Sequence, residues 1–226
     1  MGKIVCIGGL NGLKNEKGEF ISYEPRKVDK EINKLSNKKH PNVLFIGTAS
    51  KEREDYFNTF SVAYKSLGAK VEALRILNKE LTPNEISDKI LSADIIYVGC
   101  GNTRFMLEKW KEKGVDIALE KAYQKGIVLA GMSAGSYCWF NYNYDLIQGL
   151  GFINAVNCVH YNRKDEIAKK KFYDVIQNKN MMGIALDDCV ALEVIDNKFK
   201  IIKNNENAKA NKIYFDGEKF IEEELK

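Results

Sequence analysis

The chain has 226 residues, of which 45% are hydrophobic and 29% are charged, and it contains three prolines. This composition excludes a disordered chain and suffices for one substantial core, so we expect a single domain over residues 1–226. The formal net charge of +4 is small, and lysines are mixed with glutamates along the sequence, which argues against a nucleic-acid partner.

Short β-rich runs alternate with amphipathic helical patterns over the first part of the chain. The predicted strands are residues 3–7, 42–46, 70–77, 94–98 and 126–130, and the predicted helices are 26–36, 54–67, one from Pro83, 104–113 and 115–125. The best-marked helix start is Thr82, an N-cap residue followed by Pro83 and by Glu85, which can close a capping box. Strands that alternate with helices predict a parallel sheet covered by helices on both faces.

The last third of the chain changes character. A helix is predicted at 165–178, and apolar runs at 182–195 and 198–202 predict strands joined by Asp196-Asn197. Asp216-Gly217 predicts a hairpin turn between strands at 212–215 and 219–221. We therefore predict an α/β fold: three layers, a mostly parallel sheet with helices on both faces, and an antiparallel C-terminal extension.

The cysteines and the N-terminal segment bear on location and metal binding. The number of cysteines, five, is odd and none has CxxC spacing, which favours reduced thiols and argues against a zinc site. The sequence shows no signal-peptide pattern and no apolar run near the roughly 18 residues of a membrane span. We expect a cytoplasmic protein without a metal, an organic cofactor or a membrane partner.

The most informative stretch is Gly131-Met132-Ser133-Ala134-Gly135, which fits the pattern G-x-S-x-G between the strand at 126–130 and a helical pattern that starts at 137–140. Such a turn lifts the serine oxygen above the sheet, strains the backbone and needs tiny flanking residues. The N–H of Ala134 would then stabilise an oxyanion. The pattern predicts a nucleophile at Ser133, and the alternative is a tight turn in which small residues merely pack.

A second glycine-rich turn, Gly99-Cys100-Gly101-Asn102-Thr103, ends the preceding predicted strand. In a parallel sheet it opens on the same edge as the serine turn, so the N–H of Gly101 is the candidate second oxyanion donor. A phosphate cradle is the alternative, but the turn lacks the Walker lysine and a full G-x-G-x-x-G pattern.

A serine nucleophile needs a base, and the chain has only two histidines. His40 lies in a polar loop before a strand, and we expect it to be exposed and inert. His160 follows the apolar segment 152–159, at a predicted strand end, and is the candidate base. Although a lone histidine in such a place is more often structural, the serine turn leaves no other good candidate.

The acid that would orient the base is less constrained. Asp187 and Asp188 are adjacent carboxylates between two apolar runs, and Asp145 follows Ser133 by twelve residues. Asp188 is the favoured candidate, with Asp187 and Asp145 as the alternatives.

These features together resemble peptidase family S51, the serine peptidases that include aspartyl dipeptidase (peptidase E) and cyanophycinase. The resemblance also covers the opening 4–9, the segment 149–152, and His160-Tyr161 with Arg163. It implies a fold similar to class I glutamine amidotransferases with serine in place of cysteine, a nucleophile at Ser133, a base at His160, and oxyanion donors at Gly101 and Ala134. The family's orienting acid corresponds best to Asp188.

The resemblance implies a dipeptidase-like serine protease that cleaves small peptides through a catalytic triad and an acyl-enzyme. Asn102, Arg104 and Arg163 lie next to the site turns and are candidate substrate-binding residues. Cys100 stands where the family has glycine and Val159 where it often has proline, so the aspartyl preference is not carried over. An esterase or amidase with the same residues and a catalytically silent binding module remain alternatives. The sequence leaves the oligomeric state open, a homodimer included.

Overall fold

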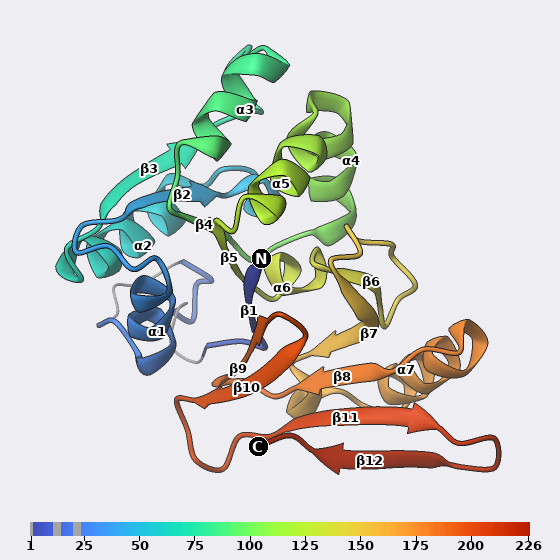
Figure 1. Cartoon of the computed structure of the whole chain (residues 1–226). Coiled ribbons are helices and arrows are strands. Elements are labelled where there is room, and N and C mark those ends of the chain that lie inside the picture. The colour runs from blue at the N-terminus through green and yellow to red at the C-terminus, as the bar shows by residue number, and fades with distance from the viewer. Residues whose placement is uncertain (1, 11–14, 20–23) are drawn as a thin grey trace.

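The computed structural model describes residues 2–10, 15–19 and 24–226, which form two sheets with surrounding helices (Figure 1). The chain begins with β1 (Lys3–Ile7), α1 (Lys27–Leu35), β2 (Asn42–Ile46), the 3-10 turn η1 (Thr48–Ser50), α2 (Glu54–Ser66), β3 (Lys70–Leu74), α3 (Pro83–Leu91) and β4 (Ile95–Val98). It continues through α4 (Thr103–Lys113), α5 (Val115–Gln124), β5 (Val128–Met132), α6 (Ala134–Tyr137), β6 (Phe140–Asn143), β7 (Ile153–Val159), the 3-10 turn η2 (Tyr161–Arg163) and α7 (Glu166–Lys179). It ends with β8 (Gly183–Leu186), β9 (Val190–Ile195), β10 (Lys198–Lys203), β11 (Ala210–Phe215) and β12 (Phe220–Glu224).

The main sheet has seven strands in the order β10-β9-β1-β5-β4-β2-β3. The five strands from β1 to β3 in this order pair in parallel, whereas β9 and β10 pair antiparallel. The carboxyl ends of the parallel strands therefore lie at one edge, where functional turns of such sheets gather. The predicted α/β architecture with antiparallel C-terminal strands is confirmed.

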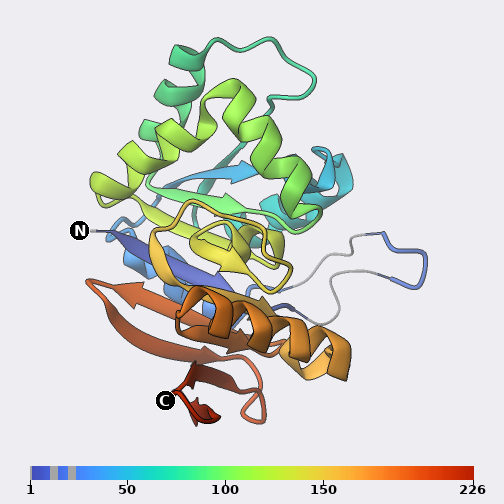
Figure 2. The same cartoon turned by 90° about the vertical axis from the view of Figure 1, so that its right-hand side faces the viewer.

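Helices cover both faces of this sheet because the side chains of each strand alternate between two cores. Ile4 and Cys6 of β1 belong to a core with residues of α3, α4 and α5, while Val5 and Ile7 belong to one with residues of α1 and α2. Figure 2 shows the same layered arrangement from the side. The parallel strands β1, β2, β4 and β5 are buried on both faces, which explains their nearly continuous apolar sequences, whereas the edge strand β3 is partly exposed and carries Lys70 and Glu72.

The second sheet has the order β12-β11-β8-β7-β6, and α7 packs on it (Figures 1 and 2). Its strands β6, β7 and β8 run parallel, and β11 and β12 form the predicted hairpin with Phe215 opposite Phe220. The sequence instead predicts strands at 182–195, 198–202, 212–215 and 219–221 as an antiparallel extension of a single sheet. The separate sheet arises because β8 and β9, predicted as one strand, diverge into different sheets at residues 187–189.

Two local predictions were wrong for identifiable reasons. The apolar run 182–195 breaks at Cys189, whose φ of 64° cannot continue a strand. The helix expected from Tyr137 ends at once, and β6 begins at Phe140. Here the carbonyl of Cys138 accepts from the N–H of Leu150 at 2.7 Å, so long-range pairing replaces the next helical turn.

No helix in the described part of the chain is long and apolar enough to cross a bilayer.

The start of α1 contains a buried carboxylate with a shifted pKa. Asp29 is fully buried, and its Oδ2 and Oδ1 accept hydrogen bonds from the Arg26 N–H at 2.9 Å and the Tyr64 hydroxyl at 3.3 Å. Burial raises the pKa of Asp29 from 3.8 to about 6, and these hydrogen bonds offset the shift only in part. Between pH 3.8 and about pH 6 the folded protein retains a proton that the unfolded chain has lost, so the free energy of unfolding falls as pH rises through this range.

We therefore predict that Asp29→Asn removes a pH-dependent loss of about 3 kcal/mol in the free energy of unfolding. The asparagine oxygen still accepts from Arg26, and its amide can donate to Tyr64, so the site keeps its contacts. Urea unfolding at about pH 4 is expected to give equal free energies for the variant and the wild type, and at about pH 7.5 the variant is expected to be more stable. An equal difference between the two proteins at both pH values would contradict the assignment.

Candidate functional site

Ser133 lies at the sharp turn between β5 and α6, with a φ of 55° and a ψ of −108°. This backbone conformation is unfavourable for any residue with a side chain and costs about 1–3 kcal/mol. Glycines make the turn possible: a Cβ at Gly131 would lie 2.1 Å from the Gly135 carbonyl oxygen, and one at Gly135 would lie 2.1 Å from that of Val98. The pattern G-x-S-x-G therefore forms the strained strand-to-helix turn that the sequence predicts.

The Ser133 hydroxyl is the first member of a hydrogen-bonded chain of three side chains. Its Oγ lies 3.1 Å from Nε2 of His160, and Nδ1 of His160 lies 2.6 Å from Oδ1 of Asp188. A neutral imidazole protonated at Nδ1 satisfies both contacts, because Nδ1 then donates to the carboxylate and Nε2 accepts from the hydroxyl. The histidine side chain is 32% exposed and the aspartate 2%, so the chain runs from the surface into the protein.

The topology of the second sheet explains why His160 and Asp188 meet. His160 directly follows β7, and Asp188 lies two residues after β8. These strands are parallel neighbours with Val159 opposite Leu186, so both leave the sheet at the same edge. The loop after β8 then returns to the end of β1, where the Cys189 N–H donates to the Gly9 carbonyl at 2.7 Å. Because β1 is next to β5, this places the pair beside Ser133.

Gly9 lies against the imidazole–carboxylate pair. A Cβ at this position would lie 2.0 Å from Oδ1 of Asp188 and 2.6 Å from Nδ1 of His160. Only glycine leaves room for that contact. Sequence reasoning missed this role, because Gly8-Gly9 reads there only as a turn after the first strand.

Asp188 is the one of the three candidate acids that contacts His160. Its backbone N–H donates to Oδ1 of Asn162 at 3.0 Å, and its Oδ2 pairs with the Arg163 guanidinium. Burial favours the neutral acid, but the hydrogen bond from His160 and the charges of His160 and Arg163 outweigh it, so the pKa of Asp188 lies below its ordinary value. The carboxylate is thus held ionised beside the imidazole.

The other candidates for acid and base have different partners. Asp187 accepts the Lys209 N–H at 3.0 Å, and burial raises its pKa. Asp145 lies in the wall of the cavity beside Ser133 and pairs with Lys171 at 3.6 Å. His40 is exposed, and its Nδ1 lies 2.9 Å from the Gly68 carbonyl oxygen.

The two candidate oxyanion donors flank the serine. Ala134 is the first residue of α6, where a helix leaves its N–H unpaired, and Gly101 lines the same cavity as Ser133. Gly101 has a φ of 145°, and a Cβ there would lie 2.1 Å from the Ala49 carbonyl oxygen. Within residues 2–10, 15–19 and 24–226, neither N–H donates a hydrogen bond, so both are available to a bound oxygen.

A cavity of about 270 Å³ opens in front of Ser133. Its lining residues come from turns and helices that follow strands of both sheets, and from the end of β6: Gly101, Asn102, Thr103, Arg104, Ser133, Tyr137, Asn143, Tyr144, Asp145, Ile147, His160 and Lys164. Lys164, whose ammonium lies 4.1 Å from the Tyr144 ring centre, carried no signal in the sequence. Among the described residues no group of His, Cys, Asp or Glu could hold a metal ion.

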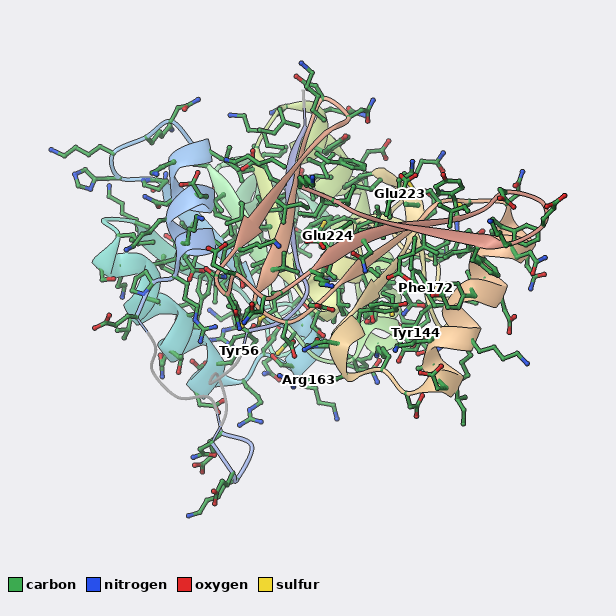
Figure 3. All side chains as sticks on the ribbon, turned by 90° about the horizontal axis from the view of Figure 1, so that it is seen from below. Tyr56, Tyr144, Arg163, Phe172, Glu223 and Glu224 are labelled. Atoms are coloured by element: carbon green, nitrogen blue, oxygen red, sulfur yellow. The ribbon has the colours of Figure 1, made fainter. Side chains whose placement is uncertain are left out.

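The three candidate substrate-binding residues are placed differently. Asn102 caps α4 by accepting the Phe105 N–H at 3.0 Å, and it also lines the cavity. Arg104, the second residue of α4, also lines the cavity. Arg163 does not line the cavity and pairs with Asp188 instead. Its side chain is 58% exposed, and the residue is labelled in Figure 3.

A parallel α/β sheet with a hydroxyl on a strained turn, beside an imidazole and a carboxylate, defines the class of serine hydrolases. The family model of peptidase family S51 matches residues 18–202, and the chain belongs to this family. It is 31% identical over 224 residues to the uncharacterized peptidase YgaJ of Bacillus subtilis (strain 168), covering 94% of this chain and 92% of that protein.

Two solved structures have a similar fold. A peptidase from an acI-B1 Actinobacterium superposes with a TM-score of 0.74 at 20% identity, covering 100% of this chain and 97% of that chain. A putative peptidase E protein from Listeria monocytogenes EGD-e gives 0.65 at 20% identity, covering 90% of this chain and 98% of that chain. Membership of peptidase family S51 makes the protein a hydrolase of the peptidase type.

Proposed function

We propose that this peptidase hydrolyses small peptides through a triad of Ser133, His160 and Asp188 and an acyl-enzyme. The observation that carries the proposal is the unbroken chain from the Ser133 hydroxyl through both nitrogens of His160 to the Asp188 carboxylate. Its distances of 3.1 Å and 2.6 Å allow proton transfer without rearrangement of the side chains.

In the proposed reaction Oγ of Ser133 attacks the peptide carbonyl carbon while Nε2 of His160 takes the hydroxyl proton. The N–H groups of Gly101 and Ala134 donate to the oxyanion. The imidazolium, stabilised by Asp188, then protonates the leaving amine as the C–N bond breaks. Water hydrolyses the ester by the same steps, with His160 as base, and releases the carboxylic acid and the free serine.

The cavity supports a short substrate. Its volume of about 270 Å³ lies just below the usual range of ligand pockets and suits a short peptide. Arg104, Lys164 and Asp145 place charges of both signs around it. Such walls favour a substrate with charged ends close to the scissile bond over an internal segment of a long chain.

The test is a dipeptide and tripeptide library together with a fluorophosphonate probe that labels activated serines. Wild type is expected to cleave members of the library and to be labelled, and Ser133→Ala to lose both. Ser92→Ala is the matched control, since that hydroxyl is exposed and donates to the Lys89 carbonyl at the end of α3. Folded wild type that neither cleaves nor labels would favour a silent binding module, and cleavage of esters alone an esterase.

Gly9→Ala is predicted to lower kcat by about 100-fold, because the added methyl group displaces His160 or Asp188 by roughly 1 Å. A Cβ would lie 2.0 Å from Asp188 Oδ1, which no rotation of the methyl group relieves. The measurement is kcat on the best library peptide, with circular dichroism to verify folding. Gly114→Ala serves as control: it places a side chain at a φ of 73° between α4 and α5, away from the site, and should keep kcat. Unchanged kcat in Gly9→Ala would show that the pair tolerates displacement.

A further inference from the structure

One short turn supplies three contacts to Asp188. His160, immediately before η2, donates to Oδ1 at 2.6 Å, and Asn162 in η2 accepts the Asp188 N–H at 3.0 Å. Arg163, the last residue of η2, pairs with Oδ2. Both carboxylate oxygens are thus taken by side chains three residues apart, and the Asp188 side chain is only 2% exposed.

This arrangement keeps Arg163 out of the lining of the cavity in front of Ser133. Its guanidinium lies on the far oxygen of the carboxylate, and the residue does not line the cavity in front of Ser133. Arg104, by contrast, lines that cavity. A substrate carboxylate would have to compete with a buried aspartate for Arg163, whereas Arg104 faces the cavity without that competitor.

We propose that Arg163 is a positioning residue that acts through Asp188: it shares the carboxylate with His160 and does not contact the substrate. The proposal rests on the proposed function only in so far as His160 is the base. Asp188 would accept from His160 with one oxygen while the guanidinium neutralises part of its charge. The imidazole therefore faces a weakened anion.

The electrostatic consequence has a definite sign. A full carboxylate charge stabilises the imidazolium, so a cation on that carboxylate makes His160 easier to deprotonate. The low pKa of Asp188 agrees with this pairing. The other charged groups near His160 are Asp187, which turns to the Lys209 N–H, and the cavity residues Arg104, Asp145 and Lys164. These groups are unchanged when Arg163 is replaced, so a difference in the titration of His160 between wild type and an Arg163 variant reports the effect of Arg163 alone.

The histidines make the test direct, because the chain has only two and each gives one Cε1–H signal in proton NMR. In Arg163→Gln the titration midpoint of His160 is expected to rise by about 0.5 to 1 pH unit. In Arg163→Lys, which keeps the charge, it should stay near the wild-type value. His40 lies in the loop beside Gly68 and should not move in either variant, which makes it an internal reference. A His160 midpoint that stays or falls in Arg163→Gln would overturn the proposal.

Kinetics provide the second readout. For the best peptide, Arg163→Gln should shift the acid limb of the kcat/KM profile to higher pH by the same amount. KM should stay nearly unchanged. A raised KM with an unmoved limb would instead make Arg163 a substrate ligand and overturn the proposal. The NMR titration needs no turnover, so failure of the proposed function appears separately, as a wild type that neither labels nor cleaves.

Discussion

Replacing His160 with glutamine is expected to lower kcat of peptide hydrolysis by about 10⁴-fold, the upper end of what a positioned general base contributes. Glutamine preserves a polar group of similar reach, so Ser133 keeps a hydrogen-bonding neighbour. The amide cannot take the hydroxyl proton, however, and it cannot return one to the leaving amine. KM should change little, because the imidazole would act on the reacting atoms and not on substrate binding. Steady-state kinetics on the best library peptide provide the measurement.

The matched control is His40→Gln, the same substitution at the chain's other histidine. His40 contacts the Gly68 carbonyl in an exposed loop and should retain wild-type kcat. Labelling by the fluorophosphonate should fall with kcat in His160→Gln and persist in His40→Gln. If both variants kept full activity, the base would have to be another group, and the proposed mechanism would fail.

The sequence identified the serine turn because its signal is local. The backbone at Ser133 needs glycine at positions 131 and 135, and this requirement is written in five consecutive residues. The parallel main sheet was predictable for a similar reason, since each buried strand is a short apolar run between helical patterns. Both predictions use physics that acts within about ten residues.

The second sheet could not be predicted in the same way, because its pairing is between distant segments. β6, β7 and β8 are parallel neighbours separated by a loop or by α7, and an apolar run does not state which partner it joins. The run 182–195 was especially misleading, since both of its strands are apolar and only the left-handed Cys189 divides them. The contact between Gly9 and Asp188 depends on this same long-range pairing.

Composition reduced the candidate bases to two histidines, and the polar loop around His40 left His160, but neither kind of evidence could decide the acid. Asp187 and Asp188 are adjacent in the loop after β8, where backbone direction decides which side chain faces His160. The backbone hydrogen bonds of this loop decide which of the two aspartates faces His160. Asp187 N–H donates to the Lys209 carbonyl, which keeps that residue beside the segment before β11, while Asp188 turns toward η2.

Asparagine at each of these two adjacent positions therefore gives a sharp comparison. Asp188→Asn is predicted to lower kcat by about 10³- to 10⁴-fold, because a neutral amide no longer stabilises the imidazolium and no longer fixes the proton on Nδ1. Asp187→Asn should have a far smaller effect, since its side chain accepts from the Lys209 N–H and does not contact His160. Kinetics and NMR titration of both variants measure the contrast.

The pH dependence gives this last prediction a second test. The pKa of Asp188 lies below its ordinary value in the folded protein, so its contribution to stability is present above the ordinary aspartate value and is lost as pH falls through the lowered one. Asp188 therefore stays ionised throughout the range in which a histidine titrates, and the acid limb of kcat/KM reports His160. In Asp188→Asn the imidazolium loses its anionic partner while Arg163 keeps its charge. The midpoint of His160 should consequently fall, opposite to its rise in Arg163→Gln. Equal displacement in Asp187→Asn, or equal loss of kcat there, would mean that the two carboxylates act together and that Asp188 alone is not the orienting acid.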